Sequence, residues 1–238
     1  MEMIDFNFKY KALIDKMKAI MNEPNLEREI IDDGVYNPEK YFSNNIRICW
    51  MLKEPYDLEN GQGGGRSYLS MFDGEDLYES TFKFGHRTTW HPIIYTSFGI
   101  HNGFKKWGEI EYLKDDHTIA EIVREVAFIN AQKLPSKGVT RTNMDDIAIS
   151  IEKHGELLKE QVELLSPNVF IFANTFHLYK NLLGLNNLNL VKSGSCNYYI
   201  KNECIFIDAY HPAQTQVTGE EYVDDIINAV KTWSNFKN

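Results

Sequence analysis

The sequence has few cysteines and no long apolar run, and each absence excludes a class of protein. Only three cysteines occur among 238 residues, namely Cys49, Cys196 and Cys204, too few and too scattered for a disulfide framework or a four-thiolate metal site. No apolar stretch approaches the ~20 residues of a membrane span. The N-terminal segment MEMIDFNFKYK has neither the apolar core nor the cleavage site of a leader. We therefore expect a cytoplasmic protein without a metal or other cofactor and without a membrane partner.

The chain also lacks internal repeats, low-complexity stretches and Pro/Ser-rich linkers. Its length and its hydrophobic content of 43% suit one α/β domain with a sizeable core. We expect a single domain over residues 1–238, with residues 1–45 packed on it as an N-terminal helical extension, and a monomer.

Basic residues are fewer than acidic ones, 25 against 34, which gives a formal net charge of −9. This charge argues against a general nucleic-acid binder. Two segments, 81–107 and 126–144, nevertheless contain no acidic residue. Their cations are Lys83, Arg87, Lys105, Lys106, Lys133, Lys137 and Arg141. Two interpretations stay open: a local positive face that suits a phosphate ligand, or loops whose cations are merely solvated.

Short apolar runs of strand length alternate with stretches of helical periodicity. We expect strands at 47–52, 126–129, 168–172 and 204–207, and helices at 6–21, 118–125, 143–166, 175–183 and 218–235. Residues 188–191 and 197–200 are either a hairpin or irregular. The alternation predicts a three-layer α/β/α domain with a central, mainly parallel four-stranded sheet.

Polar clusters follow all four predicted strands. They are KEPYD (53–57), NAQKLP (130–135), ANTFH (173–177) and AYHPAQ (209–214). Because ligands bind beyond the carboxyl ends of parallel strands, these clusters predict a site at one sheet edge.

The residue types at this edge suit the cleavage of a bond between a cationic carbon and an anionic leaving group. Glu54, beside a proline, suits the orientation of water, and His211 suits donation to an oxygen that gains negative charge. Asn130 offers a donor and acceptors to the edge of an amide-containing ring. Each residue also has a structural explanation as part of a loop or a cap, so the interpretation depends on their coincidence at one edge.

The order of these pieces resembles the uracil-DNA glycosylase superfamily, in which one strand ends in a Gly-x-Asp/Glu/Asn-Pro type loop and a later one in His-Pro-Ser/Ala. The matching segments here are Leu52-Lys-Glu-Pro-Tyr56 and His211-Pro-Ala213. Between them, Phe128–Lys133 is similar to the Asn-x-x-Lys segment of the small prokaryotic branch, and Leu165–Ile171 is similar to the segment before the third core strand. The resemblance implies a divergent bacterial-type member, from about residue 47 onward.

The resemblance also implies roles for individual residues. Glu54 and His211 would be catalytic, the first activating water and the second stabilising the uracil anion. Lys53, Tyr56, Asn130 and Lys133 would bind substrate, with Asn130 reading the base edge and Tyr56 excluding thymine. Tyr68 and Phe72 are the candidates for the aromatic residue that stacks on the base, and core packing is the alternative for both.

Three departures from the family pattern shape the functional hypotheses. Leu52 replaces the motif glycine, the iron–sulfur cysteines are missing, and Gln214–Thr218 replaces the basic, leucine-bearing wedge that enters duplex DNA. We therefore expect a hydrolase that excises uracil or another deaminated base, from single-stranded rather than duplex DNA. The alternatives are a catalytically silent homologue that binds nucleic acid or a nucleobase, and an unrelated hydrolase of small nucleosides.

Overall fold

The computed structural model describes residues 3–23, 25, 27–55, 67–83, 87–136 and 142–236. Six α-helices and seven strands occur in these residues, together with short 3₁₀ and π-helical segments. In chain order they are α1 (Met3–Met21), β1 (Gly34–Val35), α2 (Pro38–Ser43), β2 (Ile48–Leu52), η2 (Tyr68–Phe72), η3 (Tyr78–Phe82), α3 (Arg87–His101), η4 (Trp107–Glu109), η5 (His117–Glu125), β3 (Ala127–Asn130), α4 (Met144–Leu165), β4 (Val169–Ala173), α5 (Phe176–Tyr179), β5 (Val191–Ser193), β6 (Cys196–Lys201), β7 (Cys204–Ala209) and α6 (Gly219–Asn235).

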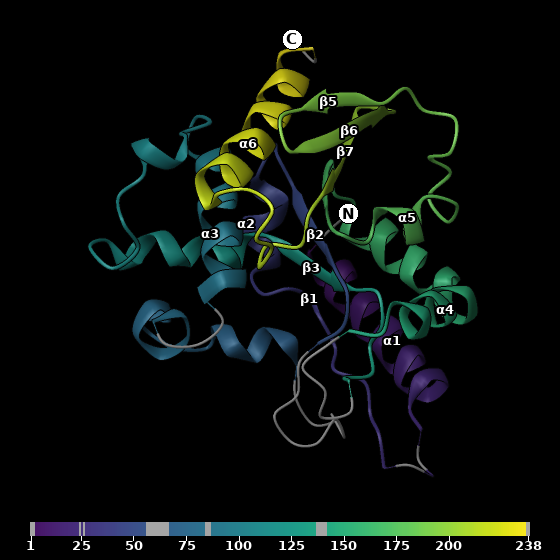
Figure 1. The fold of residues 1–238 in the computed structure, drawn as a ribbon. Helices are drawn as coiled ribbons and strands as arrows, with labels where there is room; N and C mark the ends of the chain where they lie inside the picture. Colours follow the sequence, from purple (N-terminus) through teal and green to yellow (C-terminus); the bar gives the residue numbers. More distant parts are fainter. Residues whose placement is uncertain are drawn as a thin grey trace.

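A mixed sheet with strand order β1-β3-β2-β4-β7-β6-β5 forms the centre of the molecule (Figure 1). The neighbouring strands β3, β2, β4 and β7 run parallel to one another. Strand β1 is antiparallel to β3 at one edge, and the β5–β6 hairpin extends the other edge antiparallel to β7. The predicted α/β class is confirmed, but the sheet is mixed and has seven strands rather than the four predicted.

Helices cover both faces of this sheet because successive strand residues point to opposite sides. Ile48, Trp50 and Leu52 of β2 join a core cluster with α3 and α6. Cys49 and Met51 join a second cluster with α4, α5 and the start of α1. In Figure 1 the strands accordingly lie between α3 and α6 on one side and α1, α4 and α5 on the other. Every residue of β2 is buried, as in strands covered on both faces.

Helix boundaries follow capping signals that the sequence contains. Asn143 caps α4 by accepting a hydrogen bond from the backbone N–H of Asp145, and Ser166 ends the helix in a left-handed conformation. Thr218 and Glu221 form the reciprocal capping box at the start of α6. The starts of α4 and α6 are therefore fixed by side chains that accept hydrogen bonds from backbone N–H groups of the first turn.

Several helical segments differ from the sequence-based expectations. Helix α2 was not predicted, and the helix predicted at 175–183 is the shorter α5 (Phe176–Tyr179). The segment predicted as a helix at 118–125 is a 3₁₀ helix. Helix α3 was not predicted at all, because its residues are buried on nearly every side and show no one-sided stripe, and Pro92 lies inside it.

The N-terminal region contributes to the core rather than only covering it. Leu13 and Met17 of α1 pack in a small cluster with Leu157 of α4, and the following segment supplies β1. None of the described helices has the length and apolarity that crossing a membrane requires.

Candidate functional site

Hydrogen bonds join the carboxyl ends of the four parallel strands into one edge. The backbone N–H groups of Ala131 and Gln132 donate to the carbonyls of Leu52 (3.0 Å) and Lys53 (2.9 Å), which ties the loop after β3 to the loop after β2. On the other side, the Thr175 hydroxyl donates to the Met51 carbonyl at 2.7 Å. The backbone N–H of Asn174 then donates to the Ala209 carbonyl at 2.9 Å. The four predicted loops therefore begin side by side.

Glu54 lies half-buried in the loop after β2, and its two carboxylate oxygens have different surroundings. Its Oε1 accepts a hydrogen bond from the Ser136 hydroxyl at 3.1 Å. Its Oε2 is buried and has no hydrogen-bond partner within the part of the chain that the structure describes. A buried oxygen without a donor costs about 1–3 kcal/mol, so this position favours a bound water or a ligand N–H or O–H.

A cavity of about 630 Å³ opens beside Glu54, between the end of α1, the loop after β3 and the first turns of α4. This volume is within the range of small-molecule sites. The described residues that line it are Ile20, Met21, Asn22, Glu23, Arg28, Glu54, Gln132, Lys133, Leu134, Ser136, Asn143, Asp146, Ile147, Ile149, Ser150, Lys153 and His154. His211 and Asn130 are not among them, so the described residues bring Glu54 to this cavity without those two partners.

His211 follows β7 and is held as a neutral imidazole of one tautomer. Burial, with a further contribution from the charge of Lys53, lowers its pKa to about 4. The backbone N–H of Ala213 approaches His211 Nδ1 at 3.2 Å. Because a backbone N–H can only donate, Nδ1 is the acceptor and the ring proton lies on Nε2. The His-Pro-Ala turn therefore leaves Nε2–H available as a donor.

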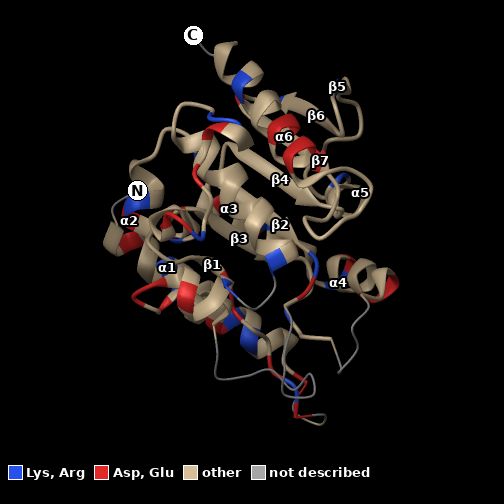
Figure 2. Cartoon of the chain, turned by 60° about the vertical axis from the view of Figure 1, so that its left-hand side comes forward, with Lys and Arg blue, Asp and Glu red and all other residues tan. Residues whose placement is uncertain are grey.

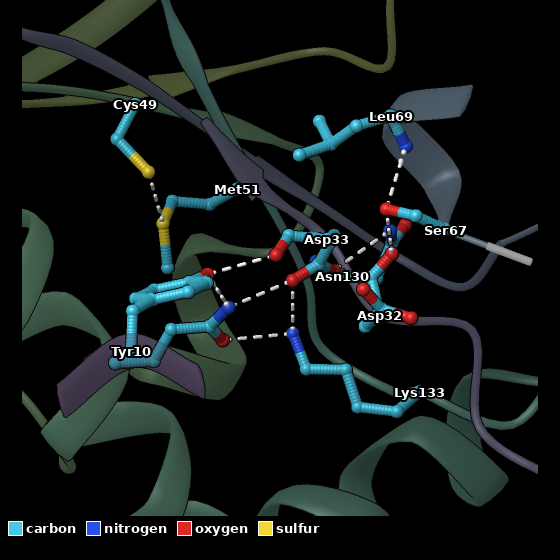
Figure 3. Close-up of polar contacts among 10 residues, drawn as sticks. Tyr10, Asp32, Asp33, Cys49, Met51, Ser67, Leu69, Asn130 and Lys133 are labelled. Carbon is cyan, nitrogen blue, oxygen red and sulfur yellow. Dashed lines mark hydrogen bonds and ion pairs between the residues drawn. The ribbon is translucent and has the colours of Figure 1, made fainter. Parts of the chain in front are cut away.

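Asn130 and Lys133 are buried in a polar network centred on Asp33 (Figure 3). Asp33 Oδ2 accepts from the backbone N–H of Asn130 at 2.7 Å and from its Nδ2 at 3.0 Å. Asp33 Oδ1 accepts from Lys133 Nζ at 2.6 Å and from Gln161 Nε2 at 2.8 Å. Tyr10 donates its hydroxyl proton to the Asp33 carbonyl at 2.8 Å.

The ammonium of Lys133 is therefore directed into the core rather than toward a phosphate. Its side chain is 1% exposed, and its second acceptor is Gln161 Oε1 at 2.8 Å. Burial lowers the pKa of Lys133, and the opposing charge of Asp33 favours its protonated form. Lys133 is among the residues that line the cavity, but its ammonium group binds Asp33 and Gln161 in the core.

Sequence reasoning missed Asp33, the residue at the centre of this network. It stands in the Asp32-Asp33-Gly34 stretch, which has the composition of an exposed turn. Only the pairing of β1 with β3 brings it beside Asn130. The sequence contains no local signal of its burial.

The aromatic candidates have different surroundings. Phe72 is fully buried, with its ring centroid 5.4 Å from that of Trp90 and 5.6 Å from that of Phe128, which is a core environment. Tyr68 is half-buried and packs 6.0 Å from both of those rings. Burial raises the pKa of Tyr68, so its hydroxyl stays protonated. Tyr56 lies outside the described residues.

In the part of the chain that the structure describes, Lys83 and Lys133 of the two acid-free segments are paired, whereas Arg87, Lys105 and Lys106 are exposed. Residues 87–101 of the first segment form α3, which is drawn almost entirely tan in Figure 2 and is largely buried. Lys83 pairs with Glu79 at 2.8 Å. In the second segment Lys133 pairs with Asp33, and Lys137 and Arg141 lie outside the described residues.

The three cysteines are free thiols, with Cys49 and Cys196 buried and Cys204 half-buried. Burial raises the pKa of Cys49, and it raises that of Cys196 to about 12, so both thiols are protonated and unreactive at neutral pH. The described residues contain no group of three or more histidine, cysteine, aspartate or glutamate side chains placed to hold a metal ion.

No protein-family model matches the chain, and no curated protein is similar to it at a significant level.

Proposed function

We propose that this protein is an N-glycosylase that hydrolyses the bond between the sugar and uracil, or another deaminated base, in single-stranded DNA. The observation that carries the proposal is the state of His211. A neutral imidazole whose Nδ1 is occupied by the Ala213 N–H presents Nε2–H at the carboxyl edge of the sheet. Such a donor stabilises a base carbonyl oxygen that becomes negative as the glycosidic bond breaks.

In this mechanism Glu54 and His211 act on opposite sides of the bond that breaks. The bond between C1′ of the sugar and the ring nitrogen lengthens, and its electron pair moves onto the base, where His211 Nε2–H donates to the carbonyl oxygen. Glu54 Oε2, which has no partner among the described residues, orients a water that adds to C1′, and it accepts the proton that this water gives up. The base leaves as the anion that His211 stabilises. Ser136 holds Oε1 and so fixes the direction of the carboxylate.

Glu54 lines the cavity and His211 is not among the described residues that line it, so the proposed substrate must lie across the strand ends to reach both. Lys53 connects the two halves, because it precedes Glu54 in the chain and its charge acts on the His211 imidazole. We propose that the base lies toward Asn130 and His211, and that the sugar and the attacking water lie toward Glu54. The cavity beside Glu54 then receives the adjoining part of the strand.

The loop after His211 supports single-stranded over duplex DNA. Gln214 folds this loop on itself: its Oε1 accepts from the backbone N–H of Val217 at 2.9 Å and from that of Gln216, and its Nε2 donates to the Val217 carbonyl at 2.9 Å. Val217 packs against the core, so this loop offers no apolar side chain that could enter a duplex.

A second candidate, a catalytically silent binder of nucleic acid or nucleobases, is favoured by two specific observations. Among the described residues His211 does not line the cavity beside Glu54, and one hydrogen of the Asn130 amide is already given to Asp33. Such a protein would bind single-stranded DNA with an affinity that falls as salt rises, because phosphate contacts release counterions.

One assay separates the two candidates. The protein is incubated with single- and double-stranded oligonucleotides that contain one uracil, and abasic sites are revealed by alkaline cleavage. The proposal predicts abasic sites in the single-stranded substrate, at a higher rate than in the duplex. Absence of product from both substrates at high protein concentration, together with salt-dependent binding, would establish the silent binder instead.

A further inference from the structure

Two exposed isoleucines from different helices line the cavity beside Glu54. Ile20 lies near the end of α1 and is 52% exposed, and Ile149 lies in the second turn of α4 and is 47% exposed. Single exposed apolar side chains are common on protein surfaces and need no explanation. Two that line one cavity of small-molecule size instead offer apolar contact to a ligand inside it.

The packing of α1 against α4 fixes the positions of both isoleucines. The Lys16 ammonium and the Glu160 carboxylate join the two helices at 2.7 Å, and Leu157 of α4 packs with apolar residues of α1. Ile20 lies one turn after Lys16, on the same face of α1. Figure 1 shows the two helices on the same side of the sheet. The apolar part of the cavity is therefore built on helices rather than on loops.

One cation that lines this cavity is available to a ligand. Arg28 is paired with Glu23 at 2.8 Å, and Lys133 is paired with Asp33 at 2.6 Å. Lys153 lines the cavity one turn after Ile149, is exposed, and has no ion-pair partner within the described residues. An ammonium beside apolar side chains suits a ligand that carries both a phosphate and a flat ring, as a nucleotide does.

We propose that this cavity is a subsite for one unpaired nucleotide next to the uracil nucleotide, with its base against Ile20 and Ile149 and its phosphate on Lys153. The inference rests on the proposed function. It names the substrate class as an oligonucleotide with an unpaired neighbour, rather than a free nucleoside. In a duplex the neighbouring base is paired and stacked, so it enters the cavity only at the cost of unstacking.

The carboxylates that line the cavity determine which way the nucleotide lies. Asp146 precedes Lys153 by seven positions, which is about 10 Å along the axis of α4. Glu54 belongs to the loop after β2, at the edge of the sheet. The phosphate therefore lies at the Lys153 end, and the sugar of the reacting nucleotide lies at the Glu54 end.

The first test measures binding and needs no activity. A fluorescein-labelled, single-stranded oligothymidylate is titrated with the full chain, and its anisotropy is recorded at several salt concentrations. Ile20→Ser and Ile149→Ser should each weaken binding about fivefold, because the base loses apolar contact. Lys153→Gln should lower the slope of log affinity against log salt by about 0.7, the contribution of one phosphate on a single strand.

Matched controls for these variants lie elsewhere on the surface. Ile4 of α1 is 83% exposed and Lys231 of α6 is exposed, and neither is among the residues that line the cavity. Ile4→Ser and Lys231→Gln should bind the oligonucleotide as the parent protein does. Circular dichroism checks that every variant is folded. Binding like that of the parent in the Ile20, Ile149 and Lys153 variants, or no binding by the parent, would overturn the inference.

The second test asks whether the neighbouring base matters for release. Single-turnover uracil release is measured for deoxyuridine and for trinucleotides with a central uracil, in which either the 5′ or the 3′ neighbour is a stable abasic analogue. One of the two abasic neighbours should raise the concentration for half-maximal rate roughly tenfold. In Ile149→Ser this factor should fall toward one, because the contact is already lost, whereas Ile4→Ser should keep it.

The failure of the inference and that of the proposed function give different results. If uracil is released but neither neighbouring base matters, or if Ile149→Ser keeps the full factor, the inference is wrong and the proposed function stands. If the parent protein releases no uracil from any substrate, the proposed function is wrong. The binding test then decides by itself whether the cavity holds an unpaired nucleotide.

Discussion

The carboxylate of Asp33 and the ammonium of Lys133 lie 2.6 Å apart, with both side chains withdrawn from solvent. Two charges in this position have lost their hydration. The ion pair compensates for this loss, together with the hydrogen bonds that Asp33 accepts from Asn130 and Gln161 and the one that Lys133 donates to Gln161. The pair connects the loop after β3 to β1 and α4. It therefore places the residues that the proposed site requires.

Removal of one partner of this pair should destabilise the protein strongly. Lys133→Met alone leaves a buried carboxylate without its counterion, and we expect a loss of about 3–5 kcal/mol in the free energy of unfolding. The double variant Asp33→Asn/Lys133→Met should recover most of that loss, because it leaves no buried charge. Urea unfolding of both single variants and the double variant gives the coupling energy. Additive losses would contradict the described pair.

Substitution of Glu54 or His211 should lower the rate of uracil release much more than it lowers the thermal stability of the protein. We expect Glu54→Gln and His211→Ala each to lower the single-turnover rate of uracil release by about 10²–10⁴-fold, since each is assigned to the transition state. Ser136→Ala should have a smaller effect, because it only releases one oxygen of Glu54. Thermal unfolding serves as the control for folding. Rates within a few-fold of the parent protein for both variants would remove these residues from the mechanism.

The protonation of His211 should couple folding to pH in a defined direction. Its pKa is about 4 in the folded state, against an ordinary value near 6.5. Between these values the unfolded state binds more protons, so the His211 contribution to the free energy of unfolding decreases as pH falls from about 6.5 to about 4, and it is constant below that. His211→Gln should remove this part of the pH dependence.

Nuclear magnetic resonance gives the direct measurement for His211. The ring should titrate with a midpoint near pH 4, and at pH 7 its proton should be on Nε2, as the Ala213 N–H contact requires. A midpoint near 6.5, or the proton on Nδ1, would contradict the described environment.

Gly34 should be intolerant of any side chain. It has a φ of 134°, and a Cβ at this position would lie 2.1 Å from the Tyr10 hydroxyl oxygen. Gly34→Ala should therefore displace Tyr10 from the Asp33 carbonyl and destabilise the protein by more than 1 kcal/mol, a rough lower limit for replacement at a positive φ. Gly108→Ala is the matched control, because nothing lies within 4 Å of a Cβ there. Urea unfolding should show little change for the control.

The sequence alone was sufficient for the elements whose signals are local. The caps at Asn143 and Thr218 and the apolar run of β2 predicted two helix starts and one core strand, because capping and strand patterning depend on neighbouring residues. The alternation of helix and strand predicted the α/β class for the same reason. It also placed Lys53, Asn130 and His211 after strands that the structure brings to one edge.

Only the tertiary structure decided the features that depend on residues distant in the sequence. The antiparallel pairing of β1 with β3 puts Asp33 beside Asn130, which lies 97 positions further along the chain. An aspartate whose neighbours suggest an exposed turn is therefore the centre of a buried network. The same packing buries Lys133 and Phe72, which the sequence offered as contacts for a ligand. Burial depends on what the rest of the chain places around a side chain. Residue type and spacing therefore located the edge of the sheet, and the packing determined which of its groups remain available.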